Sequence, residues 1–372
     1  MRVLLLMLAL AGCFSATAAD ETDDRSRSDA ILRLLNSRAS GCPKDYAAAA
    51  EIVAEDAARG KILQQYVLAI VSTDRNAPKA VQLTDEVRQR YLDGSRDKIK
   101  ALAVQRSNAL AWYLLSLEKG DATLLKRAAE GGNVQALNAW GTLTLTKTLR
   151  NLGDDTNDVE RVFYKSYSCF NEAAGKGDMN GVYNLGMCYL NGYGVEVDLD
   201  RAFECFRTAS EAGHPEAINN LGGFYRDGIV VEKDPVIATR WFAKSAEMGN
   251  AYGQLNYALA LQRGDGLKAD VVKAADYFKR SADQGCAEAV NAYAMCLYRG
   301  AGVPENKVLA VAWYRSAAES GFAPAMENLA SCYERGEGGL EKSVKRATVW
   351  KIRARAARGD RNAAAWLNQN GY

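Results

Sequence analysis

One pattern of residues returns about every 36 positions between Gly181 and Asn362. A period of this length indicates a stacked array of small helical units and is not expected of a single globular core. With Gly181 counted as position 1, every unit has a small residue at that position: Gly181, Ala217, Gly253, Ala289 and Ala325. Leucine or tyrosine follows at positions five and nine, and spacings of four place these positions on one face of a helix.

A second helix is predicted in each unit. An aspartate or asparagine, both good N-cap residues, marks its start at Asp198, Asp234, Asp270 and Asn306. A glycine, which readily takes a positive φ, ends the first helix at Gly192, Gly228, Gly264, Gly300 and Gly336. Large aromatic residues recur on the second helix at Phe206, Phe242, Phe278 and Tyr314. The sequence therefore predicts an all-α fold, an α-solenoid of stacked antiparallel helix pairs.

Three runs of this pattern, INNLGGFYRDG, YNLGMCYLNGYGV and AVAWYRSAAESG, resemble the Sel-1-like repeat, a relative of the tetratricopeptide repeat. The resemblance covers about half of the chain. It implies an α-solenoid that acts mainly as an adaptor between proteins, with the first helices lining the concave face. Two features depart from the family pattern: Val230 replaces the usual second loop glycine, and the fifth unit drifts in register around Trp350.

The chain is expected to begin with an export signal at residues 1–19, where Arg2 precedes the apolar run Val3 to Ala11. Nine apolar residues are too few to span a bilayer, which takes about 20. Two cleavage sites remain open. Leu10 to Cys13 resembles a lipobox, which would make 1–12 the signal and Cys13 the lipidated first residue, whereas Ala16 to Ala19 suits ordinary signal peptidase. Either site predicts a periplasmic protein, anchored to the outer membrane in the lipoprotein case.

The remaining domain boundaries follow from polarity and repeat register. Residues 20–29 are charged, without apolar periodicity, and are expected to form a flexible tether. Residues 30–180 carry weaker echoes of the unit and are interpreted as divergent helical repeats. Residues 181–362 are expected to form five Sel-1-like repeats, and residues 363–372 a C-terminal cap.

The charge balance is nearly even, with 47 Lys and Arg against 45 Asp and Glu, which argues against a general nucleic-acid binder. A cationic run extends from Lys342 to Arg361, and its only acidic residue is Asp360. The run suits the polar outer face of a terminal capping helix. An acidic partner or an anionic membrane surface is the alternative.

No catalytic, metal or cofactor site is predicted, and the chain is not expected to be an enzyme. The only histidine, His214, lies in an ordinary inter-repeat loop, and no nucleophile and acid assemble around it. No Cys/His cluster has the spacing of a zinc site. Some secreted cysteine-rich Sel-1-like proteins pair two cysteines in each unit and have been credited with β-lactamase activity. A β-lactamase-like hydrolase is the weaker alternative, because this sequence lacks the paired pattern.

The cysteines recur in register instead, at Cys188, Cys296 and Cys332 and at Cys169 and Cys205. Equivalent residues of adjacent units lie about one helix spacing apart, ~9 Å, which exceeds the ~7 Å Cα separation that a disulfide allows. Cys188, Cys296 and Cys332 are therefore expected to be buried free thiols.

The expected protein-binding surface lies on the first helices. Their fourth position carries asparagine in four of five units, at Asn184, Asn220, Asn256 and Asn328. An asparagine both donates and accepts, so a ladder of them could pair with the backbone of an extended segment. Position eleven gives Arg263, Arg299 and Arg335, which could bind carboxylates. Structural roles are the alternative for both sets: the asparagines could bond to the adjoining repeat, and the helix dipole alone favours the arginines.

The partner predicted for this surface is another protein, an envelope component or a secreted effector. The leading hypothesis is a scaffold or adaptor in the bacterial cell envelope. The alternative is a periplasmic immunity-type protein that neutralises a toxic effector. Nucleic acid is not expected as a partner, and contact with a membrane is expected only through a lipid at Cys13.

Overall fold

The computed structural model describes residues 53, 54, 57, 62–71, 83–106, 108–150 and 156–371. The expected export signal, the tether, Cys13 and Cys42 lie outside these residues. Every regular element in the described part of the chain is a helix, so the predicted all-α class is confirmed. None of the described helices combines the length and the apolar character that crossing a membrane requires.

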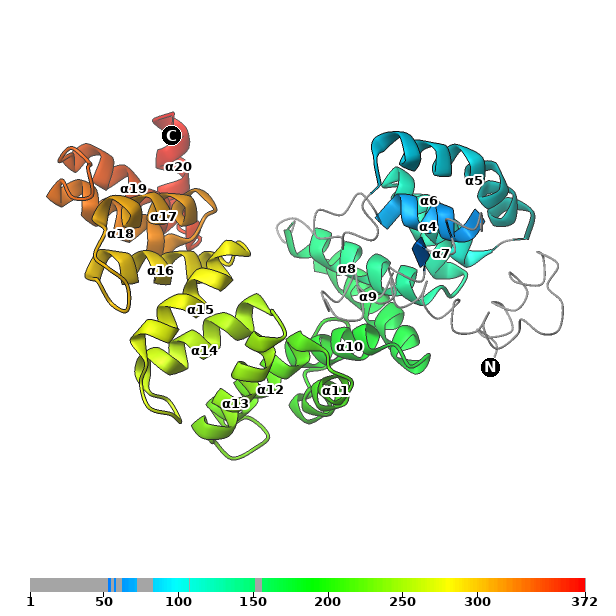
Figure 1. Cartoon of the computed structure of the whole chain (residues 1–372), viewed down its shortest axis with the longest axis horizontal. Coiled ribbons are helices and arrows are strands. Elements are labelled where there is room, and N and C mark those ends of the chain that lie inside the picture. Colours follow the sequence, from blue (N-terminus) through cyan, green and yellow to red (C-terminus); the bar gives the residue numbers. More distant parts are fainter. Residues whose placement is uncertain are drawn as a thin grey trace. The chain divides into compact units, whose positions relative to one another are not determined.

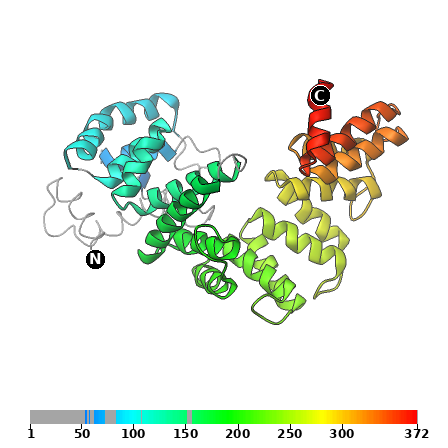
Figure 2. The ribbon, with the colours of Figure 1, turned by 180° about the vertical axis from the view of Figure 1, so that it is seen from behind.

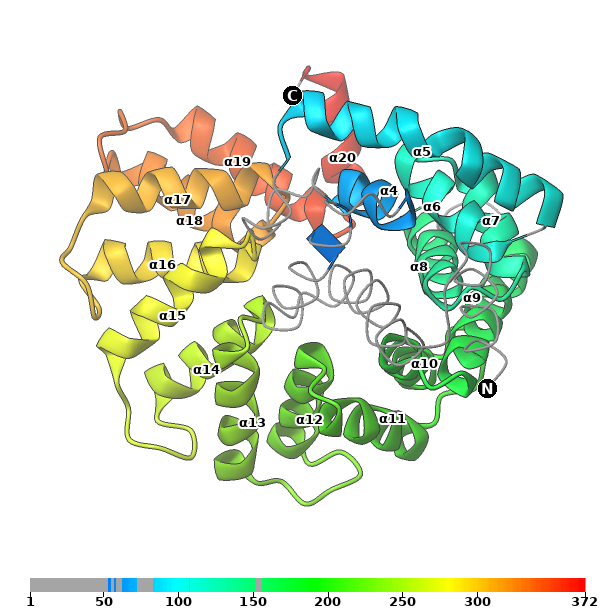
Figure 3. The same cartoon turned by 45° about the vertical axis from the view of Figure 1, so that its right-hand side comes forward.

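The chain divides into two units, one ending at His214 and the other beginning at Pro215. In the first unit, α4 packs on α5, α6 on α7, α8 on α9 and α10 on α11 (Figure 3). The helices are α4 Ile62–Val71, α5 Asp85–Arg106, α6 Ala109–Lys119, α7 Ala122–Glu130, α8 Val134–Arg150, α9 Thr156–Gly175, α10 Met179–Asn191 and α11 Leu199–Glu211. The divergent N-terminal region therefore also consists of helix pairs.

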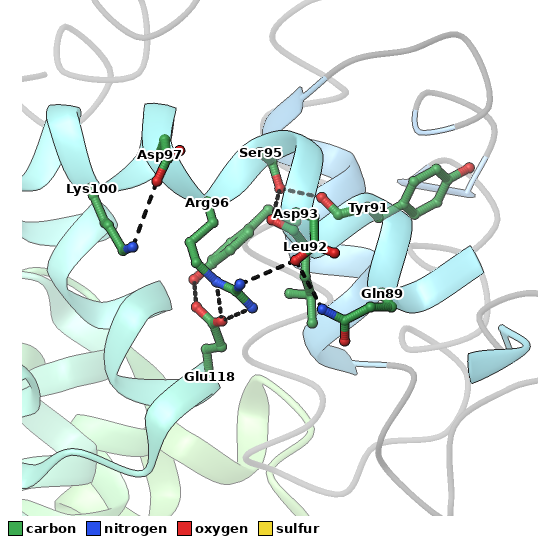
Figure 4. Close-up of polar contacts among 10 residues, drawn as sticks. Gln89, Tyr91, Leu92, Asp93, Ser95, Arg96, Asp97, Lys100 and Glu118 are labelled. Carbon is green, nitrogen blue, oxygen red and sulfur yellow. Dashed lines mark hydrogen bonds and ion pairs between the residues drawn. The ribbon is translucent and has the colours of Figure 1, made fainter. Parts of the chain in front are cut away.

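A partly buried polar contact holds the first three of these helices together. Glu118 of α6 accepts hydrogen bonds from Tyr66 of α4 and, at 2.7 Å, from Nε of Arg96 of α5. Figure 4 shows the Arg96 guanidinium facing the Glu118 carboxylate, with Nη2 at 2.6 Å from Oε1. Burial, followed by the bond to Glu118, raises the pKa of Tyr66 well above its usual range. Tyr66 therefore stays protonated and donates its hydrogen to the carboxylate.

The second unit repeats one helix pair along its length, and each pair contacts the next (Figures 1 and 2). Its helices are α12 Pro215–Asp227, α13 Pro235–Glu247, α14 Ala251–Arg263, α15 Val271–Asp283, α16 Ala287–Arg299, α17 Lys307–Glu319, α18 Ala323–Arg335, α19 Val344–Ala357 and α20 Arg361–Gln369. The last of these spans most of the expected C-terminal cap.

The predicted helix ends are confirmed. The side chain of Asp270 accepts a hydrogen bond from the Lys273 amide at 2.9 Å, and Asn306 caps α17 in the same way through Leu309. Asp198 and Asp234 cap α11 and α13. Because these side chains satisfy amide groups that have no partner inside the helix, they fix where each second helix begins.

Close packing of small against large residues holds each pair together. Phe242 of α13 is buried against Gly222 of α12, where a Cβ atom would lie 2.5 Å from the phenyl ring. Phe206 and Phe278 are likewise buried on α11 and α15. Ser245 and Ser281 add a bond within each pair, donating to the carbonyl oxygens of Pro215 at 2.8 Å and Ala251 at 2.7 Å.

The loop between the two helices of a pair lies against the preceding pair. Gly302 has a φ of 74°, and a Cβ on it would lie 2.0 Å from the carbonyl oxygen of Val271 in the pair before. Gly266 approaches the backbone of Pro235 in the same manner. Val230 stands at the equivalent position in its own loop and keeps a positive φ of 65°, so the departure from glycine changes the residue but not the backbone conformation.

Candidate functional site

The predicted site residues of the second unit lie along its first helices, α12, α14, α16 and α18. Positions 4, 7 and 11 of each repeat fall on the first helix, are three or four residues apart and share one side of that helix. We call the surface formed by these three positions the first-helix face. In α14 it consists of Asn256, Leu259 and Arg263, and in α16 of Ala292, Met295 and Arg299.

Three of the four asparagines, Asn184, Asn256 and Asn328, bond to the adjoining repeat. Asn256 Nδ2 donates to Asn219 Oδ1 at 2.8 Å, and Asn328 Nδ2 donates to Asn291 Oδ1 at 2.8 Å. In both cases position 4 of one repeat reaches position 3 of the repeat before it. Each amide retains a second N–H and its own carbonyl oxygen, so the bond does not use up its capacity to pair with a bound backbone.

Asn184 makes the corresponding bond in the first unit, where its Nδ2 lies 3.4 Å from Asn138 Oδ1. Asn138 in turn donates to Asp178 Oδ2 at 2.6 Å, and Asp178 caps α10 through the amide of Gly181. Burial is the largest effect on Asp178 and raises the pKa of its carboxyl group. Asn220 is half-buried on α12.

The three arginines differ in their surroundings. Arg263 and Arg299 are exposed at the ends of α14 and α16, and neither forms an ion pair with any residue that the structure describes. Arg335 is exposed at the end of α18, but its Nε lies 2.9 Å from Glu337 Oε2. Arg263 and Arg299 therefore present unneutralised guanidinium groups beside the half-buried Leu259 and Met295.

Glu337 is a site residue that the sequence reasoning missed. It accepts hydrogen bonds from Tyr298 and, at 3.1 Å, from Lys307 Nζ, and both partners belong to the preceding repeat. These bonds, first the one from Tyr298, lower the pKa of Glu337. The signal was weak, because the residue at this loop position differs in every repeat: Tyr193, Ile229, Asp265, Ala301 and Glu337. The contacts of Glu337 with Tyr298 and Lys307 fix the loop after α18, and its ion pair with Arg335 neutralises that arginine.

The basic residues near the C-terminus are partly neutralised within the fold. Lys351 Nζ lies 2.6 Å from Glu334 Oε1, Arg355 pairs with Asp360, and Arg358 pairs with Glu327. Arg353 lies over the ring of Trp350, with 4.7 Å between Cζ and the ring centroid. These contacts agree with a polar capping surface on α19 and α20.

The thiols of Cys188, Cys296 and Cys332 are buried and free, as expected. Burial raises the pKa of Cys188 to about 12 and raises the pKa of Cys296 and Cys332 as well.

His214, also buried, stacks on Tyr183 with 4.6 Å between ring centroids, and its Nε2 lies 3.2 Å from Asn180 Oδ1. Among the described residues, no three His, Cys, Asp or Glu side chains group closely enough to hold a metal ion.

The raised pKa values of Cys188, Cys296 and Cys332 predict that the folded protein loses stability at alkaline pH. An unfolded chain binds fewer protons than the folded chain once the pH exceeds about 9, the ordinary value of a cysteine. The stabilisation is therefore complete below pH 9 and is lost as the pH rises towards 12. We expect the urea midpoint to fall between pH 8 and pH 10, and to fall less in Cys188→Ala. Equal pH slopes in the two proteins, or thiol labelling of the folded protein as fast as of the unfolded one, would contradict this expectation.

The stacked helix pairs and their register define a helical-repeat protein of the solenoid class. The Sel1 repeat family model matches five consecutive segments, residues 181–214, 215–250, 251–286, 287–322 and 323–354. The chain therefore contains five Sel1 repeats, and the predicted resemblance is confirmed. The match ends the fifth repeat at residue 354, before the expected limit of 362.

The chain is also similar to several solved structures. A Sel1 repeat protein from Oxalobacter formigenes is 27% identical, with a TM-score of 0.55, over 66% of this chain and 96% of that one. A protective antigen of uropathogenic Escherichia coli is 24% identical (TM-score 0.43; 92% and 80% covered). An immunity protein from Pseudomonas aeruginosa is 18% identical (TM-score 0.37; 53% and 75% covered). None of the curated proteins compared with the chain matches it. The fold is typical of protein–protein interaction scaffolds.

Proposed function

We propose that this protein is an exported scaffold of the bacterial cell envelope that binds another protein along the first-helix face of its second unit. The observation that carries the proposal is the pair Arg263 and Arg299. Both are exposed, occupy one register position in adjacent repeats and lack an ion-pair partner among the described residues. The helix dipole favours an arginine in the last turn of each helix, but it does not require the guanidinium group to stand beside partly buried apolar side chains without an acidic partner.

The chemistry of this face selects an extended segment that bears carboxylates. Guanidinium groups bind carboxylates through two parallel hydrogen bonds, which adds geometric specificity to charge attraction. Asn256 and Asn328 each retain a carbonyl oxygen and an N–H for the backbone of the segment. Leu259 and Met295 supply an apolar strip between the two polar rows.

The arginines provide the test. The triple variant Arg263→Ala, Arg299→Ala, Arg335→Ala is expected to keep its helical circular dichroism and to capture less partner by crosslinking in cells. Each arginine that pairs in a desolvated site contributes about 1 kcal/mol or more. Arg240→Ala with Arg315→Ala is the matched control, because these arginines are exposed on the second helices α13 and α17. If the folded triple variant captures as much partner as the unaltered protein does, the first-helix face is not the binding surface.

The proposed export depends on the N-terminal sequence, with Arg2 before the apolar run Val3 to Ala11. If Cys13 is the lipidated first residue, Cys13→Ser moves the mature protein from the membrane fraction to the soluble fraction. Mass spectrometry of the mature N-terminus checks this directly. An N-terminus at Ala19 or Asp20 would contradict the lipoprotein but not export, whereas retention of Met1 would contradict export.

A further inference from the structure

The arginines at position 11 of the first-helix face are not equally available, because the loop residue two positions later differs. Arg335 is followed by Glu337, and Arg335 Nε lies 2.9 Å from Glu337 Oε2. Arg335 also lies over the ring of Tyr298, with 5.7 Å between Cζ and the ring centroid. Arg299 is followed by Ala301 and makes neither kind of contact with a residue that the structure describes. The guanidinium group of Arg335 is therefore engaged within the fold, whereas that of Arg299 is not.

The backbone that carries these loop residues has the same conformation after α16 and after α18. Gly300 and Gly336, which end the two helices, both have a φ of 67°. The amide that follows each glycine donates to the equivalent carbonyl oxygen of its helix, at 3.0 Å after α16 and at 3.1 Å after α18. A glutamate in place of Ala301 would therefore start from the same backbone position relative to its arginine as Glu337 does.

The preceding repeat holds Glu337 in the position where it pairs with Arg335. Tyr298 donates a hydrogen bond to Glu337 Oε2, and Lys307 Nζ donates to Oε1 at 3.1 Å. Lys307 Nζ also lies 5.1 Å from the centroid of the Tyr298 ring. A carboxylate of a partner that approached Arg335 would have to displace one that these two side chains already hold.

Acidic residues also lie near the other two arginines, but they do not pair with them. Asp265 has the loop position of Glu337, two residues after Arg263, and its side chain is one methylene group shorter. Glu305 lies in the loop that follows Arg299. Neither carboxylate forms an ion pair with a residue that the structure describes. Arg263 and Arg299 can therefore select a carboxylate through directed hydrogen bonds, without an excess of positive charge around them.

We propose, on the basis of the function proposed above, that Glu337 is a specificity-determining residue of the first-helix face. By holding Arg335, it confines recognition of the partner's carboxylates to Arg263 and Arg299. Equivalent positions of adjacent repeats lie about 9 Å apart, and an extended segment covers this distance in about three residues at ~3.3 Å each. The segment that is recognised therefore carries two acidic side chains three residues apart, and a third acidic side chain at the same spacing adds no affinity.

Two fluorescein-labelled synthetic peptides test this proposal on the full-length protein by fluorescence anisotropy at low ionic strength. One peptide has two glutamates three residues apart, the other has three glutamates at the same spacing, and leucine and serine fill the positions between. The unaltered protein is expected to bind both peptides within about twofold of each other. Glu337→Gln keeps an acceptor for Tyr298 and releases Arg335. We expect it to bind the three-glutamate peptide about fivefold more tightly than the unaltered protein does.

Two further changes show whether the arginines carry these effects. Glu337→Gln combined with Arg335→Ala is expected to return to the affinity of the unaltered protein, and Arg335→Ala alone to change neither affinity by more than about twofold. Ala301→Glu makes the opposite change, because it places a carboxylate beside Arg299. We expect it to weaken binding of the two-glutamate peptide about fivefold, and its uncharged match Ala301→Gln to leave that binding unchanged.

The outcomes separate the role of Glu337 from the binding face itself. Equal affinity of the unaltered protein and Glu337→Gln for the three-glutamate peptide would overturn the role of Glu337, and so would a gain that survives Arg335→Ala. Peptide binding that is unaffected by Arg263→Ala with Arg299→Ala would instead contradict the first-helix face as the binding surface. If the unaltered protein binds neither peptide, the face does not recognise carboxylates, and both proposals fail.

Discussion

Replacing Gly302 with alanine is expected to destabilise the second unit by about 2–4 kcal/mol. Two costs add. An alanine held at the φ of 74° found here is disfavoured by about 1–2 kcal/mol. Its Cβ would also lie 2.0 Å from the Val271 carbonyl oxygen, so the loop or the preceding helix must move. Hydrogen exchange of the amides in α15 and α16 measures the loss locally, without assuming that the whole chain unfolds in one step.

Gly285→Ala is the matched control. Gly285 has a φ of 86°, and a Cβ on it would meet no atom within 4 Å. Gly285→Ala is therefore expected to cost only the conformational term of about 1–2 kcal/mol, without a steric clash. If the two variants lose the same stability, the loop does not lie as close to the preceding repeat as the structure places it.

Truncating Phe278 to alanine is expected to cost about 3–5 kcal/mol, the usual range for a fully buried phenylalanine. Phe278 is 0% exposed, and it packs in the core shared by repeats of the second unit. In a solenoid each repeat depends on its neighbours, so the loss should spread to the adjacent pairs. We expect faster hydrogen exchange in α14 and α16 as well as in α15.

Tyr252 supplies the control for this truncation. It is 58% exposed on α14, so Tyr252→Ala removes an aromatic ring that the core does not use. Its cost should stay within about 0.5 kcal/mol. Faster exchange confined to α15 in Phe278→Ala would show that the repeats are energetically independent, contrary to the stacked arrangement.

The fold was predictable because its determinants are local and repeated. N-caps such as Asp270 and Asn306, and glycines such as Gly264, each act within a few residues of chain. Because the same pattern recurs in five units, a single departure such as Val230 does not obscure it. The end of the fifth repeat was less predictable, because its second helix, α19, begins at Val344, one residue later than the 36-residue period from Lys307 of α17 would place it.

The candidate site was only partly predictable. The register put Asn256 and Arg263 on one side of a helix, and the structure has them there. Which atoms pair between repeats depends on how adjacent helices are offset, and no single repeat encodes this. The bond from Asn256 to Asn219 and the cluster around Glu337 therefore emerged only from the structure.

Site-specific photo-crosslinking in cells tests the central claim, that another protein lies on the first-helix face. A photoreactive residue placed at Arg299, on α16, should yield a discrete crosslinked partner, and the same residue at Arg315, on the second helix α17, should not. A partner crosslinked equally from both positions, or from Arg315 alone, would contradict this claim.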